Sequence, residues 1–348
     1  MFFDGHNDVL WRLAENCGSV YGFLSDTCPG HLDFKRAQEV GLLGGLFAIS
    51  IPPWIGSSTR GSRISLPNGG YAWPYSPQLS LELAQSSVTA QCETYRVLLA
   101  KGADRIVPIK RKKDLERLSS QRLGILLHLE GADPIAEDLS NFDDWLKLGL
   151  RSLGVTWSRP NVFGSGVPIR FPCAPNIGPG LSPAGFALLE RCEANGVLID
   201  VSHLNEAGFW DVIRTAKRPV VASHSNYFSI CPSSRNLTDD QARAIGKTGG
   251  LIGLNFGCHD VRPDGKEDSN TSIELVVAHC LKGLNLVGED CVALGSDFDG
   301  TMVPTEIGDV IGLKRLQDAL RGKQISTEVI EKICYRNWLR ILKETLPS

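Results

Sequence analysis

The chain has 348 residues, of which 42% are apolar and 22% charged, with a formal net charge of −3 at pH 7. This length is ample for a large buried core. The only dense basic run is K-R-K-K at residues 110–113, so we expect no nucleic-acid partner. No apolar run approaches the ~20 residues of a transmembrane helix, so we expect no membrane partner either.

The first strand candidate begins immediately after Met1, in the stretch "FFDGH". This arrangement leaves no room for a signal peptide and predicts a cytoplasmic protein. Ten cysteines are scattered along the chain without a C-x-x-C pair. We expect them to be reduced core residues rather than a disulfide framework.

Eight short, nearly continuous apolar segments occur in chain order, which is typical of parallel strands covered on both faces. Helical patterns separate most of them. This alternation predicts an α/β fold, a (β/α)8 TIM barrel, with a doubly wound open sheet as the alternative. Because no repeat or linker interrupts it, residues 1–348 are expected to form a single barrel domain. The predicted strands cover residues 2–8, 44–50, 123–131, 150–157, 196–203, 219–226, 249–257 and 291–300.

Helix signals lie between these segments. A helix is expected to open at the Ser-Pro of residues 76–77, and another has Ser182 as its N-cap and Pro183 at its first position. Further helices are predicted over residues 237–249, 269–288 and 326–346. Two long segments, 51–76 and 158–182, have no regular pattern. Both follow strands, which places them on the face where barrel active sites are built.

Metal-binding side chains recur at the ends of the predicted strands. An isolated H-x-D or strand-end histidine is a weak signal, since each is more often a packed or hydrogen-bonded residue. In a barrel, however, six strand ends converge on one small area. Three histidines together with carboxylates suit a transition-metal site in which one carboxylate bridges two ions. The six residues are His6, Asp8, Glu130, His203, His224 and Asp297.

The remaining histidines are assigned ordinary roles. His128 lies two residues before Glu130 but deeper in its strand, and His279 is expected to pack within a helix. His31 and His259 are expected in loops. The acids of "RPDGKEDSN" (262–270) do not match the spacing of an EF-hand calcium loop.

Six motifs in order resemble the membrane dipeptidase family, metallopeptidase family M19. They are "DGHND" with Trp11 after it, "HLEGAD", "GVLIDVSH", "VVASHSN", the following "SSRN", and "GSDFDG". The resemblance spans nearly the whole chain and implies a TIM barrel of the metal-dependent hydrolase type, two zinc ions and a small-molecule substrate such as a dipeptide. It also suggests a homodimer.

The resemblance implies a role for each matching residue. His6, Asp8 and Glu130 would hold one zinc ion, and Glu130 would bridge to a second ion held by His203 and His224. A hydroxide between the ions would attack the peptide bond. The resemblance further implies that Arg235 holds the substrate and that Asp297 is the catalytic acid/base, with Asp299 as the competing assignment in D-F-D.

Two positions depart from the family pattern. Family members usually have a histidine where "GVTW" has Trp157, and there it stabilises the oxyanion. An indole also has one N–H donor, but the alternative is that Trp157 only packs the pocket wall. Family members often have a tyrosine near the place of Asp260, and an acid there would disfavour an anionic group.

These observations leave three functions open. The first is a zinc dipeptidase, with tolerance of a D-residue at the C-terminal side of the substrate. The second is a metal-dependent hydrolase of another amide, a lactam, a lactone or an N-acyl amino acid. The third is a non-catalytic metal-binding barrel, which the complete ligand set disfavours.

Overall fold

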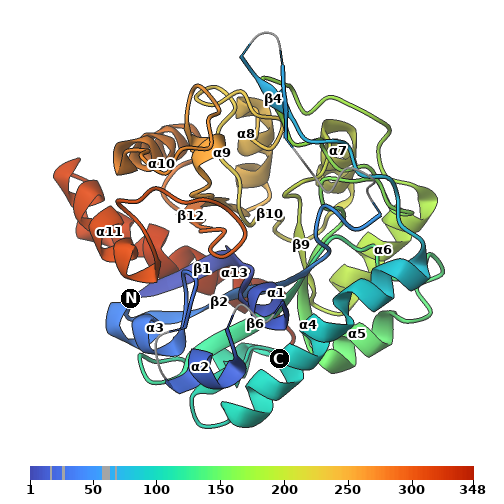
Figure 1. The fold of residues 1–348 in the computed structure, drawn as a ribbon, viewed down its shortest axis with the longest axis horizontal. Coiled ribbons are helices and arrows are strands. Elements are labelled where there is room, and N and C mark those ends of the chain that lie inside the picture. Colours follow the sequence, from blue (N-terminus) through green and yellow to red (C-terminus); the bar gives the residue numbers. More distant parts are fainter. Residues whose placement is uncertain (16–17, 26–27, 57–62, 67–68) are drawn as a thin grey trace.

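Eight parallel strands form a nearly closed barrel in this computed structural model, which describes residues 1–348 except 16–17, 26–27, 57–62 and 67–68. The strands follow one another around the ring, and a bridge between Asn7 and Phe298 joins the first to the segment after the last (Figure 1). The short strand β5 (Ile106–Pro108) pairs with β6 outside this path. The barrel strands are β1 (Phe2–Asn7), β2 (Leu42–Ser50), β6 (Leu123–Glu130), β7 (Leu150–Gly154), β9 (Leu198–Asp200), β10 (Val221–Ala222), β11 (Leu251–Leu254) and β12 (Val292–Leu294).

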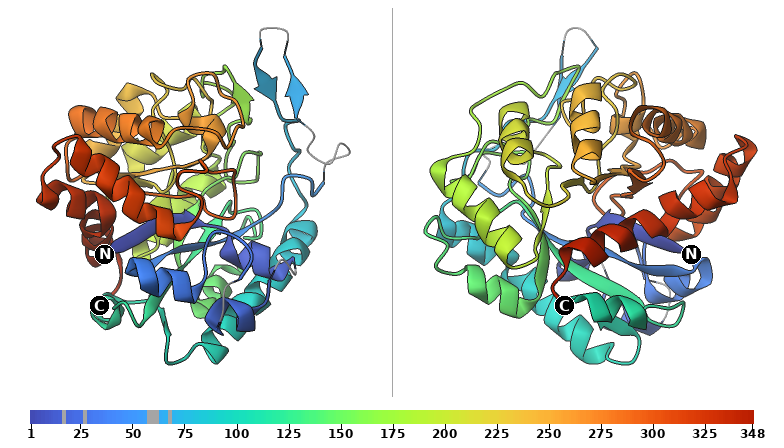
Figure 2. Two further views of the ribbon diagram at one scale, coloured as in Figure 1. Left: turned by 60° about the vertical axis from the view of Figure 1, so that its left-hand side comes forward. Right: turned by 180° about the vertical axis from the view of Figure 1, so that it is seen from behind.

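Helices surround the barrel, and the C-terminal helix runs across it at the back (Figure 2). The α-helices are α1 (Val9–Ala14), α2 (Val20–Ser25), α3 (Phe34–Val40), α4 (Leu81–Lys101), α5 (Phe142–Leu148), α6 (Pro183–Ala194), α7 (Glu206–Thr215), α8 (Asp239–Lys247), α9 (Cys258–Val261), α10 (Ile273–Val287), α11 (Leu313–Gly322), α12 (Thr327–Glu331) and α13 (Asn337–Thr345). Two 3-10 helices, η1 (Lys112–Arg117) and η2 (Val310–Gly312), and the π-helical turn η3 (Lys332–Arg336) complete them.

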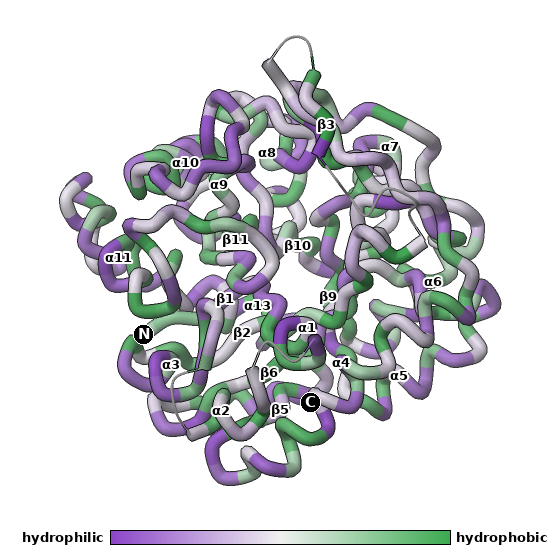
Figure 3. Tube along the Cα trace, viewed as in Figure 1, coloured by the Kyte–Doolittle hydropathy of each residue, from purple (hydrophilic) through white to green (hydrophobic). Residues whose placement is uncertain are grey.

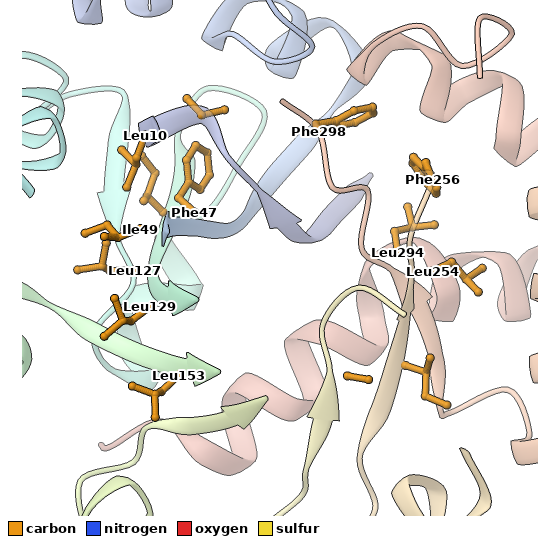
Figure 4. Packing of buried hydrophobic residues seen from close by; sticks show 14 of the residues in the cluster. Leu10, Phe47, Ile49, Leu127, Leu129, Leu153, Leu254, Phe256, Leu294 and Phe298 are labelled. Atoms are coloured by element: carbon orange, nitrogen blue, oxygen red, sulfur yellow. The ribbon is translucent and has the colours of Figure 1, made fainter. Parts of the chain in front are cut away.

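Two large apolar clusters build the core, and a small third one joins Tyr71, Phe171 and Cys231. The larger lies between strands and helices, where residues such as Phe47, Ile49 and Leu129 pack outward from the barrel (Figure 4). The second takes two residues from β2 and one from each of six other barrel strands, and adds apolar residues of α13, among them the fully buried Trp338. Polar and apolar stretches alternate along the surrounding helices, as expected for helices with one buried face (Figure 3).

All eight predicted strands are present, but most end earlier than predicted. The strand predicted over 196–203 covers only Leu198–Asp200, because the Asp200 carboxylate accepts hydrogen bonds from the backbone N–H groups of Ser202 and Ser223. His203 and Asp297 have left-handed backbones, with φ of 67° and 59°. These two strand ends therefore lie in turns, and the turns carry the side chains of His203 and Asp297.

Helix starts were predicted with mixed success. Ser182 caps α6 by accepting a hydrogen bond from the N–H of Gly185, and Pro183 is its first residue, as predicted. The start at residues 76–77 was wrong. The helix begins at Leu81 with Ser80 as its cap, whereas the Ser76 hydroxyl donates to the carbonyl of Pro53.

The two long segments after β2 and β7 pair with each other. Strands β3 (Ile64–Ser65), β4 (Tyr71–Ala72) and β8 (Arg170–Phe171) form a small antiparallel sheet. This sheet projects beyond the barrel on one side (Figure 2). Residues far apart in sequence thus meet over one end of the barrel.

Two predictions from composition can be compared with the structure. The nine cysteines within the described residues are free thiols, and Cys17 lies outside those residues. Among the described helices, none combines the length and the apolar character that crossing a membrane would need.

Candidate metal centre

Glu130, the last residue of β6, is the central residue of the site. Its Oε1 lies 2.9 Å from Nε2 of His203, 3.3 Å from Nε2 of His224 and 3.7 Å from Nε2 of His6. The three imidazoles follow or end three different strands, and all four side chains are buried. The barrel therefore brings these predicted residues to one point.

A second group of ligand atoms adjoins the first. His6 Nε2 lies 3.3 Å from Asp8 Oδ2, and one ligand atom each from His6, Asp8 and Asp297 lie within 4.8 Å of one another. His6 and Asp8 approach each other although Asp8 lies beyond the end of β1, where it precedes α1. All six predicted strand-end residues thus belong to one cluster.

The spacing of these atoms fits a bound metal ion. Zinc–nitrogen bonds of about 2.0–2.1 Å in tetrahedral geometry place two ligand atoms about 3.4 Å apart. The separations around Glu130 Oε1 bracket this value. Both ring nitrogens of His6 are buried and make no hydrogen bond to the described residues, which fits a ligand nitrogen. Gly300 leaves room for the carboxylates, since a Cβ there would lie 2.2 Å from Asp8 Oδ2.

Hydrogen bonds orient two of the histidines from behind. Nδ1 of His203 lies 2.7 Å from Ser158 Oγ, and Nδ1 of His224 lies 2.8 Å from Ser223 Oγ. The Ser223 hydroxyl in turn donates to the Asp200 carboxylate. These contacts point both Nε2 atoms towards Glu130, the arrangement expected of metal-binding histidines.

Burial shifts the pKa values of the cluster. Burial raises the pKa of Glu130 to about 8 and that of Asp297 to about 6. Burial lowers the pKa of both His203 and His224 well below the ordinary value, which favours the neutral imidazole that binds metals. For His6, burial is outweighed by the carboxylates of Glu130, Asp8 and Asp297, which raise its pKa to about 10. A divalent cation would stabilise the ionised carboxylates.

Asp299 does not join the cluster. Its carboxylate pairs with the Arg12 guanidinium at 2.7 Å and accepts the backbone N–H of His31. In an extended strand, alternation would point Asp297 and Asp299 to the same side, which is why Asp299 was a competing assignment. That expectation was wrong, because both residues have left-handed backbones rather than extended ones. The geometry therefore favours Asp297 as the acid of D-F-D that serves the site.

A pocket of about 200 Å³ opens beside the metal cluster. Four residues of the cluster, Asp8, Glu130, His203 and Asp297, line it. The three predicted substrate-binding residues, Arg235, Trp157 and Asp260, all line it. The site therefore combines a candidate metal centre with a cavity large enough for a small molecule.

Arg235 and Asp260 are fixed within this pocket by a shared neighbour. The hydroxyl of Ser233 accepts the backbone N–H of Arg235 at 3.3 Å and donates to Asp260 Oδ1 at 2.8 Å. One guanidinium nitrogen of Arg235 also donates to the carbonyl of His224 at 3.3 Å. Both side chains are buried, and Arg235 presents a cation close to a predicted metal ligand.

Trp157 is half-buried and forms part of the pocket wall. Its ring stacks on the imidazole of His203 with centroids 5.5 Å apart, and the Arg159 guanidinium lies 4.9 Å from its ring centre. Within the described residues its indole N–H makes no hydrogen bond. The contacts support the packing alternative considered for this residue.

The four remaining histidines lie outside the cluster. His128 is buried beneath it and bonds to Ser152 Oγ through Nδ1 at 2.9 Å, and His279 is buried on α10. His31 lies in a loop, as predicted. His259 was wrongly predicted in a loop, because it lies on the short helix α9 and lines the pocket.

A family model decides the relationship of this chain to known proteins. The model of membrane dipeptidases, peptidase family M19, matches residues 1–346. The chain belongs to this family. The barrel and the motifs on which the resemblance rested are accordingly those of an M19 protein, and the family is one of metal-dependent dipeptidases.

Proteins with related sequences or structures support this assignment. A metallopeptidase of Rhodobacter sphaeroides, solved with a phosphinate mimic of the dipeptide L-Ala-D-Ala, is 37% identical, with a TM-score of 0.92 over 99% of both chains. An uncharacterised Klebsiella pneumoniae protein from the pqqA 5′ region is 43% identical over 73% of this chain and 94% of its own. The Aspergillus terreus dipeptidase ataJ is 28% identical over 98% of this chain and 83% of its own.

Several residues of this M19 site were missed in the sequence. Ser158 and Ser223 orient the predicted ligands His203 and His224, and Ser50 donates to Asp8 Oδ1 at 3.0 Å. The place of Ser223 directly before His224 is a signal that could have been used. Trp54 and Glu267 also line the pocket, but they come from segments whose pattern predicted no structure.

Proposed function

We propose that this protein is a dinuclear zinc dipeptidase in which His6, Asp8, Glu130, His203 and His224 would hold the two ions, with Glu130 serving both. The observation that carries the proposal is the convergence of three imidazole nitrogens on one carboxylate oxygen, 2.9–3.7 Å away, beside a substrate-sized pocket. Asp8 completes the ligand set beside His6. Two zinc ions, when bound, would polarise the scissile carbonyl and acidify the attacking water.

Asp297 is the proposed proton carrier. Its Oδ2 accepts a hydrogen bond from the Asn255 side chain at 2.9 Å, while its Oδ1 lies on the Gly300 side, next to the Asp8 carboxylate. One oxygen is thus held and the other faces the cluster. A carboxylate in this position can take a proton from the attacking water and deliver it to the leaving amine nitrogen.

Arg235 is the proposed partner of the substrate carboxylate. It is the one arginine or lysine among the described residues that line the pocket, and its planar guanidinium suits two carboxylate oxygens. A D-configured C-terminal residue is part of the proposal, because the Rhodobacter sphaeroides relative was solved with a mimic of L-Ala-D-Ala.

A second candidate keeps the metals and changes the substrate to another amide, such as an N-acyl amino acid. Trp157 favours it, since an indole stacked on His203 takes the place of the family histidine. The buried acid Asp260, in the same pocket, also differs from the family tyrosine.

A library of dipeptides and their N-acetyl counterparts tests both candidates. The purified protein is expected to contain about two zinc ions per chain, to cleave free dipeptides, and to lose activity with a chelator and regain it with zinc. Asp297→Asn is expected to lower kcat by 10²–10⁴-fold while metal content stays unchanged. Cleavage of N-acetyl substrates alone would favour the second candidate, and a metal content near zero would refute both.

A further inference from the structure

One wall of the pocket is entirely apolar. It consists of Trp11, from the start of α1, and of four consecutive residues after β2, namely Ile51, Pro52, Pro53 and Trp54. We call this set the tryptophan–proline wall. The two indole rings lie 5.9 Å apart at an angle of 57°, and Trp54 is 40% exposed. A large aromatic surface exposed inside a cavity is typical of a ligand-binding surface.

The backbone of this wall is held in place. The Arg159 side chain, which is fully buried, donates to the carbonyls of Ile51 at 2.6 Å and Pro52 at 3.2 Å. The Ser76 hydroxyl donates to the carbonyl of Pro53 at 3.0 Å. The two prolines restrict the backbone further. A wall fixed in this way can bind a side chain without first being ordered.

The wall and Arg235 lie on opposite sides of the metal centre. The wall follows β2, and the segment with His224 and Arg235 follows β10. In the order of the eight barrel strands β2 and β10 are four positions apart, which is half of the ring (Figure 1). On the wall side, Ser50 contacts Asp8, whereas on the other side Arg235 contacts the carbonyl of His224. The scissile bond would lie between them.

We propose that the tryptophan–proline wall binds a large apolar, preferably aromatic, side chain on the N-terminal residue of the dipeptide. This inference rests on the proposed function, because Arg235 must hold the C-terminal carboxylate for the other residue to reach the wall. The side chain would pack against the indole of Trp54 and the proline rings. Small N-terminal residues such as alanine would leave this surface uncovered.

Steady-state kinetics on Phe-Ala, Ala-Phe and Ala-Ala test the inference. We expect kcat/KM to be at least about tenfold higher for Phe-Ala than for Ala-Ala, since even one methylene in a fitted pocket is worth about tenfold or more. For Ala-Phe, kcat/KM should exceed that of Ala-Ala by a much smaller factor. Trp54→Ala should reduce the ratio of Phe-Ala to Ala-Ala by about tenfold. Phe186→Ala is the matched control, because Phe186 is 37% exposed and lies on α6, outside the pocket lining.

The outcomes separate this inference from the function on which it rests. A preference for Ala-Phe over Phe-Ala, or a ratio that Trp54→Ala leaves unchanged, overturns the inference and leaves the dipeptidase intact. If no dipeptide is hydrolysed, the proposed function fails. Calorimetric binding of Phe-Ala and Ala-Ala then decides the inference. If Phe-Ala binds more tightly than Ala-Ala and Trp54→Ala abolishes this difference, the inference is supported. If the two dipeptides bind equally, it is overturned.

Discussion

Gly300 offers the sharpest test of the side of the metal centre formed by Asp8 and Asp297. A Cβ atom at this position would lie 2.2 Å from Asp8 Oδ2 and 2.4 Å from Asp297 Oδ1. Carbon and oxygen atoms in contact stay about 3.3 Å apart, so Gly300→Ala must displace both carboxylates by about 1 Å. A displacement of this size can lower a rate about 100-fold, which corresponds to ~2.7 kcal/mol of transition-state stabilisation. We expect kcat/KM for dipeptides to fall by about this factor, with reduced metal content.

The assay combines dipeptide kinetics, metal analysis by mass spectrometry and thermal unfolding of the same samples. Gly322→Ala is the control, because a Cβ at Gly322 would meet nothing within 4 Å. The control should match the wild type in all three measurements. If Gly300→Ala keeps more than a third of the wild-type activity together with its full metal content, Asp8 and Asp297 do not converge as described, and the reasoning is refuted.

Three further predictions concern single side chains. Trp157→Phe should keep kcat within about fivefold, because the ring contact with His203 is retained; a loss of 10²–10³-fold would instead identify the indole N–H as an oxyanion donor. Asp299→Asn should destabilise the fold by about 3 kcal/mol in urea unfolding, since it breaks the buried ion pair between Asp299 and Arg12, while metal content should stay unchanged. Burial lowers the pKa of His279 to about 4, so this residue makes the free energy of unfolding fall as the pH drops from about 6.5 towards 4. Between pH 7 and pH 5 its contribution to that fall is about 2 kcal/mol. His279→Asn should abolish this contribution in urea unfolding at the two pH values.

Much of the site could be predicted because strand ends in a barrel converge whatever their sequence separation. The apolar segments that carry Glu130, His203 and His224 at or near their ends marked three such strand ends, and the structure brings Nε2 of both histidines within 3.3 Å of Glu130 Oε1. The prediction depended on the order of strands around the ring, which a regular alternation of strands and helices determines.

Features that depend on contacts between loops could not be predicted. The left-handed turn that separates Asp297 from Asp299 has no periodic signal, and strand alternation misled at this point. The pairing of the two long segments through β4 and β8 is likewise absent from local sequence. The sequence did not indicate whether the apolar residues after β2 would face a cavity or the core, because the same apolar residue types fill cores and line pockets.

Trp157 and the tryptophan–proline wall are connected through one side chain. Arg159 lies against the ring of Trp157 and also donates to the carbonyls of Ile51 and Pro52. A histidine at position 157 would offer the guanidinium a smaller aromatic face. Arg159 is fully buried, so its position depends on such contacts. Trp157, which departs from the family pattern beside His203, therefore also supports the wall on which we propose that substrate selection depends.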